Sequence, residues 1–170
     1  MLSVGAGWPP LTPIAGIFTM TYADVHPIPV GDAEGHVLLI SRSTGLNRNT
    51  GPGDYMADAE VVNVEIADLA QGNGPHQGYV TFAKGGDTTL IRWSGTVATT
   101  LAPDRQPVTT FRGSWTLVKG TGRYAGASGS GGYEGRLLSR DDYEVKWDGR
   151  LDLKEVRAGR SSGPWWLGAT

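Results

Sequence analysis

The chain has 170 residues and a formal net charge of −2, with basic and acidic side chains scattered along its length. This length is ordinary for one domain. The absence of any block of like charge argues against nucleic acid or an anionic membrane surface as the main partner. Cysteine is also absent, which excludes disulfides, thiolate metal sites and catalytic thiols.

The first residues, MLSVGAGWPPLTP, contain neither a basic segment nor an apolar run of the length found in signal peptides. No stretch of the chain approaches the length of a transmembrane helix. We therefore expect a cytoplasmic protein with no membrane partner.

Glycine is the one residue type with unusual abundance. The 26 glycines are about twice the ordinary usage, and ten prolines accompany them. They lie between and inside alternating apolar runs and do not form one low-complexity block. This distribution predicts many short strands, tight turns and strand bends, and it argues against a helical protein.

The N-terminal half predicts a first strand after an extended arm. Residues 1–13 hold three prolines and two glycines and are expected to form the arm. Ile14–Asp24 then alternates in a strand pattern that places Phe18, Met20 and Tyr22 on one face. Two prolines follow closely and are expected to end the regular structure, because they lack a donor for the strand ladder.

Three further strands are expected before residue 85. Gly35–Ser41 is a short apolar run, and Arg42–Asp54 is rich in turn residues and predicts a long loop. Tyr55–Leu69 is rich in valine and predicts a strand, bent near Ala59. Gln77–Lys84 is expected to be the next strand, and the following GGD predicts a tight turn.

The clearest alternation occurs in the segments Thr88–Thr100, Thr109–Lys119 and Tyr143–Lys154. Each places aromatic residues and glycine on one face and charged or hydroxyl residues on the other. A strict period of two with this contrast indicates a sheet with one dry and one wet face. The residues expected on the dry face are Ile91, Trp93, Val97, Phe111, Trp115, Val145, Trp147 and Leu151.

The placement of glycine beside aromatic residues favours a barrel over a flat sandwich. Glycine on the concave side of a strand lets the sheet coil tightly or makes room for a large neighbour. With Tyr133–Arg140 the chain holds about eight strands joined by hairpin-length connections. We predict an all-β domain over residues 14–155, an eight-stranded antiparallel up-and-down barrel with an apolar interior that has room for a small ligand.

The tail, residues 156–170, contains two adjacent tryptophans, Trp165 and Trp166. An exposed pair of tryptophans is costly to keep in solution, so at least one is expected to pack on another subunit or cap the barrel mouth. The tail therefore predicts a homodimer or a larger homo-oligomer.

Several familiar catalytic motifs are missing from the sequence. His26, His36 and His76 match no metal-ligand spacing, so we expect surface or hydrogen-bonded histidines and no metal site. None of the three stands in a recognisable acid–base arrangement, so catalysis is expected to survive replacement of any one of them. No G-x-S-x-G nucleophile elbow occurs, and no cofactor is expected.

The segment GSWTLVKGTGRYAGASGSGGYEGRL resembles the allene oxide cyclase barrel group, which also includes the dirigent proteins. The shared pattern is a strand that ends in a Gly-Thr-Gly turn, followed by an aromatic residue, a short helical turn and a glycine-rich strand. The matching positions are Gly120, Thr121, Gly122, Tyr124, Gly126 and Gly129. The resemblance implies an eight-stranded calycin-like barrel with an apolar cavity. It also implies the binding of a flexible hydrophobic substrate and steering of ring formation without a cofactor, as in bacterial barrels that cyclise polyketides.

Three functions remain open at this point. The first is a cyclase or isomerase that acts on an apolar polyene- or polyketide-like substrate, with orientation supplying much of the rate. The second is a non-catalytic, lipocalin-like carrier of an apolar small molecule. The third is a structural module with a solid barrel. A buried or paired carboxylate facing the cavity would favour the enzyme over the carrier.

The candidate catalytic residues are Glu60, Tyr133 and Tyr22. Glu60 shares its register with Val62 and Val64, so its carboxylate is expected in the interior, where burial would raise its pKa. Other polar candidates of the same kind are Asp24, Tyr79 and Tyr143. The residues predicted to bind the substrate are Phe18, Met20, Tyr79, Trp93, Phe111, Trp115, Tyr143 and Trp147.

Overall fold

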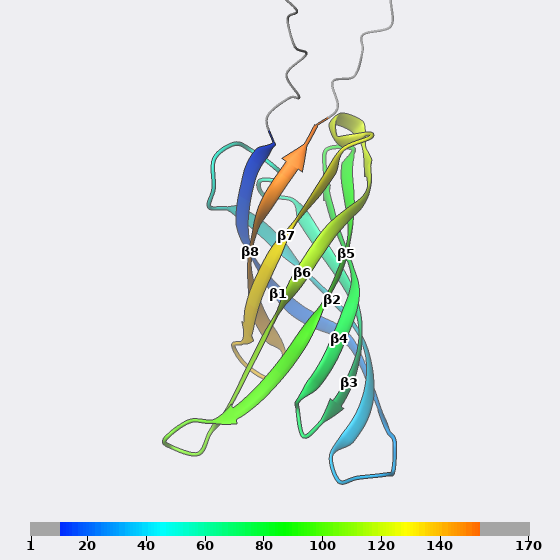
Figure 1. The fold of residues 1–170 in the computed structure, drawn as a ribbon, viewed down its shortest axis with the longest axis vertical. Coiled ribbons are helices and arrows are strands. Elements are labelled where there is room, and N and C mark those ends of the chain that lie inside the picture. Colours follow the sequence, from blue (N-terminus) through cyan, green and yellow to red (C-terminus); the bar gives the residue numbers. More distant parts are fainter. Residues whose placement is uncertain (1–10, 154–170) are drawn as a thin grey trace, which may run out of the picture.

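The structure, a computed structural model, describes residues 11–153, and its strands close into one barrel (Figure 1). Each strand pairs antiparallel with the strand before it, and β8 pairs with β1 to close the ring. The predicted fold class, an eight-stranded antiparallel up-and-down barrel, is confirmed. The elements are β1 (Thr12–Pro29), β2 (His36–Asn49), β3 (Glu60–Ala70), β4 (Gly74–Lys84), β5 (Asp87–Leu101), β6 (Pro107–Thr121), the short 3₁₀ helix η1 (Gly122–Tyr124), β7 (Ser128–Leu137) and β8 (Asp142–Asp152).

Strand β1 is longer than its prolines predicted. It pairs with β8 only as far as Thr21, but it continues along β2 as far as Pro29. The last part of β1 is therefore paired on one side only, and proline is tolerated at such an edge because the missing N–H belongs to no ladder. A register shift between Tyr22 and Asp24 marks the point where the strand turns away from β8.

The segment between β2 and β3 also departs from the prediction, with a longer β2 and a later start of β3. Strand β2 runs through Asn49, into the segment expected to be a loop, and β3 begins only at Glu60. The residues between β2 and β3 form a loop in which Met56 and Asp58 have positive φ angles. This backbone conformation is incompatible with continued strand pairing. This loop folds inward, so that Tyr55 and Met56 are buried.

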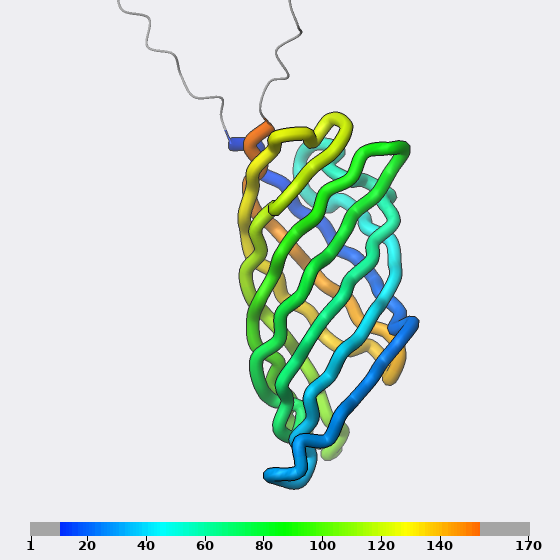
Figure 2. Tube along the Cα trace, turned by 90° about the vertical axis from the view of Figure 1, so that its right-hand side faces the viewer, coloured from blue at the N-terminus to red at the C-terminus, as the bar shows by residue number. Residues whose placement is uncertain are grey.

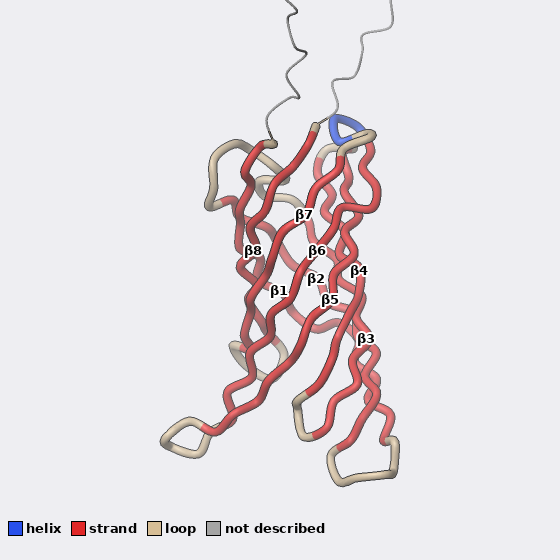
Figure 3. Tube along the Cα trace, in the orientation of Figure 1, coloured by secondary structure: helices blue, strands red, loops and turns tan. Residues whose placement is uncertain are grey.

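The two ends of the barrel are built differently (Figures 2 and 3). At one end lie the inward-folded loop 50–59 and η1, and we call this the closed end. At the other end lie the four turns β1–β2, β3–β4, β5–β6 and β7–β8, and we call this the open end. In Figure 3 the helix, in blue, lies at the top, three of these turns lie at the bottom, and the β7–β8 turn lies somewhat higher.

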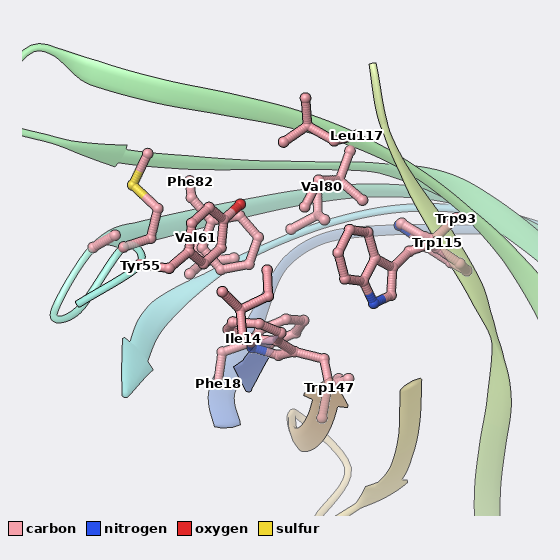
Figure 4. Close-up of a cluster of buried hydrophobic side chains, with 14 of the residues drawn as sticks. Ile14, Phe18, Tyr55, Val61, Val80, Phe82, Trp93, Trp115, Leu117 and Trp147 are labelled. Carbon is pink, nitrogen blue, oxygen red and sulfur yellow. The ribbon is translucent and has the colours of Figure 1, made fainter. Parts of the chain in front are cut away.

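Aromatic side chains pack together at the closed end (Figure 4). The Tyr55 ring lies edge-on to Trp147 at a centroid distance of 5.6 Å, and Phe82 lies 6.0 Å from Trp147. The Trp147 indole donates a hydrogen bond to the side-chain oxygen of Asn47 at 3.0 Å. Asn47 in turn donates to the backbone carbonyl of Met56 at 2.8 Å, so the loop and the strands are held as one unit.

The interior face agrees with the period-two alternation of the later strands. All eight residues expected on the dry face from β5, β6 and β8 point inward, and seven of them are buried, with Phe111 half-buried. Trp93 pairs with Trp115 across β5 and β6, which places both indoles on the same interior wall. The prediction that these strands share one interior is therefore confirmed.

The predicted N-terminal arm lies almost wholly outside the described residues, and the C-terminal tail with its tryptophan pair lies entirely outside them. The homo-oligomer that the tail suggested therefore stays a prediction. None of the helical structure within residues 11–153 has the length and apolar character needed to cross a bilayer.

Candidate active site

A cavity of about 250 Å³ occupies the barrel interior between the closed-end aromatic cluster and the open end. Tyr55, Phe82 and Trp147 form its floor. Its outermost lining residues belong to the strand ends and turns of the open end, so the cavity reaches that end of the barrel. These mouth residues are Leu39, Leu69, Gly72, Thr99, Thr109 and Leu137.

The cavity remains open because its large aromatic rings lie against glycines of neighbouring strands. A Cβ placed on Gly16 would overlap the ring of Trp147, and one on Gly78 would overlap Trp93. The prediction that glycine beside aromatic residues makes room in the interior is therefore correct in geometry. The same relation holds for Gly149 with Trp115, Gly135 with Phe111, and Gly95 and Gly113 with the Tyr133 hydroxyl.

A chain of three polar side chains crosses the cavity wall from β3 to β7. Glu65 on β3 and His76 on β4 point inward, and they are only 8% and 5% exposed. Glu65 Oε1 lies 2.8 Å from His76 Nδ1, and the Tyr133 hydroxyl lies 3.0 Å from His76 Nε2. The Ser41 hydroxyl donates to the other carboxylate oxygen of Glu65 at 3.3 Å. The carboxylate, imidazole and phenol therefore form one hydrogen-bonded line.

The carboxylate of Glu65 fixes the orientation of the His76 imidazole. When it accepts the proton of Nδ1, the neutral ring carries its lone pair on Nε2. That nitrogen then accepts a hydrogen bond from the Tyr133 hydroxyl. Trp93 and Phe111 pack edge-on against the imidazole, with ring centroids 4.7 and 5.7 Å away. The ring is thus held by hydrogen bonds at both nitrogens and by packing on its faces.

A second polar chain runs beside the first. The Trp93 indole donates to Asn63 Oδ1 at 2.9 Å, and Asn63 Nδ2 donates to the Tyr143 hydroxyl at 3.1 Å. The Tyr143 and Ser43 hydroxyls are hydrogen-bonded to each other. Every buried polar side-chain atom among the described residues has a partner, as expected for a network that orders a site.

The phenols that line this part of the cavity are held in the protonated state. Burial raises the pKa of Tyr143 to about 12, although hydrogen bonds from Ser43 and Asn63 favour its phenolate. Burial also raises the pKa values of Tyr22 and Tyr133 well above their usual range, and the negative charge of Glu65 adds to both shifts. At neutral pH all three are therefore hydroxyl donors inside an apolar cavity.

Together these groups have the geometry that acid–base chemistry requires. His76 Nε2 carries a lone pair at the cavity wall, and the Glu65 carboxylate is hydrogen-bonded to the other nitrogen of the ring. Protonated phenols lie next to Nε2 and can donate hydrogen bonds to a negative charge that develops on a substrate. The expectation that no histidine stands in an acid–base arrangement is wrong, because strand pairing brings Glu65 and His76 together from two different strands. No group of three or more candidate metal ligands converges anywhere in residues 11–153.

Most of the predicted site residues reach the cavity. Of the catalytic candidates, Tyr22 and Tyr133 line it. Met20 is fully buried in the core cluster beside the cavity. The predicted binding residues that line the cavity are Phe18, Trp93, Phe111, Trp115, Tyr143 and Trp147.

Three candidates point away from the cavity, contrary to the prediction. Glu60 and Asp24 are exposed on the outside of the barrel, and Tyr79 is 48% exposed on the outer face of β4. For Glu60 the error lies in which face of β3 is inside. The outer face of β3 carries Val64 and Ile66, which are about half exposed, so its apolar character does not indicate burial.

The residues that sequence reasoning missed are Glu65, His76 and Asn63. Asn63 and Glu65 were visible as polar positions inside an apolar strand, but a single polar residue on a strand face is ordinarily solvated. His76 was missed because the expected strand began only at Gln77, whereas β4 begins at Gly74. The signal that could have found Glu65 is its alternation with Val61 and Ala67, which are buried on the same face. The partnership of Glu65 with His76 depends on the pairing register of β3 and β4, in which Ala67 stands opposite His76.

Comparisons with known proteins give structural matches only. No protein-family model matches the chain, and no curated protein sequence matches it. The chain is similar in structure to the pterocarpan synthase dirigent protein GePTS1, with 16% identity, a TM-score of 0.44 and coverage of 91% of this chain and 98% of that chain. It is also similar to the pterocarpan synthase dirigent protein PsPTS1, with 13% identity, a TM-score of 0.47 and coverage of 88% and 99%. Both are dirigent proteins.

Proposed function

We propose that the barrel binds an apolar small molecule in its interior and converts it by proton transfer that leads to ring closure or isomerisation, without a cofactor. The observation that carries the proposal is the Glu65–His76 pair in the wall of the apolar cavity. A polyene- or polyketide-like substrate fits the apolar walls, and the open end allows part of a longer chain to remain outside.

The buried pair favours an enzyme over a carrier. An apolar ligand can be held by burial of its surface alone, and a buried carboxylate costs free energy unless it is paired. A carrier therefore gains nothing from placing Glu65 and His76 in its cavity wall. A general base needs such a pair, because the carboxylate orients the imidazole and stabilises its protonated form.

The structural-module hypothesis required a barrel packed solid with side chains. The described barrel does not meet that requirement, because it contains a cavity of about 250 Å³. The carrier hypothesis remains the second candidate, because the same cavity would serve it.

The test is a comparison of wild-type protein with Glu65→Gln on a panel of linear polyenes and polyketide-like polyketones. A cofactor-independent cyclase or isomerase gives a product with the mass of its substrate, or that mass less water, at a new chromatographic retention time. We expect such a product with the wild type and a loss of about 100-fold or more in its rate with Glu65→Gln. Glu60→Gln, an exposed carboxylate on the same strand, is the matched control and should retain the wild-type rate.

A ligand that binds and is recovered unchanged from every member of the panel would support the carrier instead. Equal product formation by the wild type and by Glu65→Gln would contradict the role given to the buried pair.

A further inference from the structure

The lining of the cavity restricts its ligand to a neutral molecule of limited rigid size. Glu65 and His76 are the only acidic and basic side chains among the lining residues, and each is occupied by the other. A charged ligand would therefore be desolvated without a counter-charge, which is strongly unfavourable. An apolar cavity of about 150 Å³ accommodates benzene. The cavity of about 250 Å³ thus corresponds to a rigid part of roughly two fused rings.

The polar groups are placed to recognise one oxygen atom and one removable proton. They lie on the wall between the aromatic floor and the mouth, on the inward faces of β1, β3, β4, β7 and β8. His76 Nε2 is an acceptor, and the Tyr133 hydroxyl 3.0 Å from it is a donor. Tyr22 and Tyr143 add two more phenols, whose ring centroids are 5.1 Å apart. An acceptor oxygen on the ligand would find donors here, and the adjacent carbon would face a base.

We infer that the substrate is a neutral carbonyl compound with a removable proton on the carbon next to the carbonyl, and that His76 removes this proton. The inference rests on the proposed function and names its substrate class. The Tyr133 hydroxyl, released from His76 by the ligand, donates to the carbonyl oxygen. Glu65 acts as a positioning residue that holds the Nδ1 proton and favours the imidazolium that forms.

The electron and proton balance closes without any added reagent. The C–H bond breaks, its proton goes to His76 Nε2, and its electron pair forms an enolate whose oxygen accepts the Tyr133 hydrogen bond. For isomerisation, the imidazolium returns the proton to a different carbon of the conjugated system. For ring closure, the enolate carbon forms a bond to a second carbonyl carbon of the same molecule. The resulting alkoxide then takes the proton from His76.

The direct test uses 2-tetralone, a two-ring ketone with acidic protons next to its carbonyl. The protein and the ketone are mixed in D₂O, and deuterium incorporation is followed by NMR. We expect exchange faster than the buffer rate with the wild type. His76→Gln should lose about 100-fold or more of that enhancement, as expected for removal of a general base. Glu60→Gln, on the outside of the barrel, should exchange at the wild-type rate. Equal exchange by the wild type and His76→Gln would overturn the inference.

The role of Glu65 is separated from a merely structural one by measuring the maximal exchange rate and the KM for 2-tetralone separately. Glu65→Gln keeps the shape of the side chain but removes the charge that favours the imidazolium formed during proton removal, so the maximal rate should fall while the KM stays nearly unchanged. Binding of 2-methylnaphthalene, which needs only the apolar walls, should be unchanged in this variant. An unchanged maximal rate, or a rise in KM that accounts for the whole loss, would overturn the positioning role.

A binding comparison separates failure of this inference from failure of the proposed function. The probes are 2-naphthol, which resembles the enol of 2-tetralone, and 2-methylnaphthalene, which has a similar shape and no oxygen. Tryptophan fluorescence reports binding because three indoles line the cavity. We expect 2-naphthol to bind about tenfold more tightly or better, and we expect Tyr133→Phe to reduce this preference.

If both probes bind equally and no exchange occurs, the carbonyl inference is wrong while the apolar site stands. If neither probe binds, the proposed function is wrong and the inference falls with it.

Discussion

The closed and open halves of the barrel interior are built from the same alternating strands, but their inward side chains differ in kind. In the closed half, the aromatic rings of Tyr55, Phe82 and Trp147 pack edge to face and fill the space between the strands. In the open half, the same inward positions carry Glu65 and His76 around an empty volume. The closed half buries apolar surface that stabilises the barrel, and the open half retains polar groups that cost stability unless they are paired. The difference indicates that stability and chemistry are placed in separate layers along one barrel axis.

The largest expected effect comes from removing a ring of the closed half. Trp147→Ala should lower the free energy of unfolding by about 3–5 kcal/mol, because the indole is buried and its neighbours cannot close the gap. Urea unfolding followed by circular dichroism measures this. Tyr79→Ala, an aromatic residue on the outer surface, is the control and should cost about 1 kcal/mol or less. A loss below that control value for Trp147→Ala would mean that the closed half does not dominate stability.

The next effect belongs to the open half and depends on pH. The pKa of Tyr143 is raised to about 12 in the folded barrel, against 10.0 in its ordinary state. Between these values the unfolded chain releases a proton that the folded chain keeps, so stability is unaffected below pH 10 and falls as the pH rises to 12. Two pH units correspond to about 3 kcal/mol for this group. Urea midpoints measured between pH 8 and 12 should show a fall, and Tyr143→Phe should make it less steep, because the raised pKa values of Tyr22 and Tyr133 also contribute to it. An equally steep fall in Tyr143→Phe would assign it to other groups.

The glycine-lined wall can be tested with two adjacent residues. A methyl group on Gly131 would overlap the backbone carbonyl of Asp148, whereas the nearest atom to one on Gly132 is 3.6 Å away. Gly131→Ala should therefore cost about 1–3 kcal/mol, and Gly132→Ala should change stability by no more than about 0.5 kcal/mol. Thermal unfolding of the two variants side by side measures the difference. Equal stabilities would show that the wall yields to a methyl group.

The smallest stability effect is expected at the centre of the proposed chemistry. Glu65→Gln preserves the size of the side chain, and its amide oxygen can still accept from His76 Nδ1, so the free energy of unfolding should fall by about 1 kcal/mol. The same urea titration used for Trp147→Ala checks this value. A cost as large as that of Trp147→Ala would mean that the polar pair is a stabilising element first, and the separation of the two halves would fail.

The fold was predictable because the strongest sequence signals report local geometry. The period-two alternation around Trp93, Trp115 and Trp147 requires only that each strand has a dry face, and the structure places those faces together. The boundaries were less predictable. Pro29 lies in a strand because that part of β1 is paired on one side only, which depends on the stagger of the barrel.

The site was only partly predictable, for a related reason. Tyr22 and Tyr133 were found because they follow large apolar residues or glycines on an inward face. Glu65 was missed because the outer face of β3 is as apolar as its inner face, so the pattern of hydrophobicity does not reveal which face is inside. The pairing of Glu65 with His76 is a relation between strands, and it follows from register, which no single-strand pattern contains.

The contact of cavity rings with glycines on neighbouring strands has a consequence for how a ligand would be received. Trp147 lies where a side chain on Gly16 would otherwise stand, and Trp93 likewise occupies the space above Gly78. A ring that packs against a glycine in this way has few other rotamers available. Ligand binding therefore does not have to restrict the motion of the ring. The entropy of ordering these walls is lost during folding, and association is correspondingly less unfavourable. The glycines thus give the barrel a preformed cavity. Its width is set by how closely each ring packs against the backbone of the neighbouring strand.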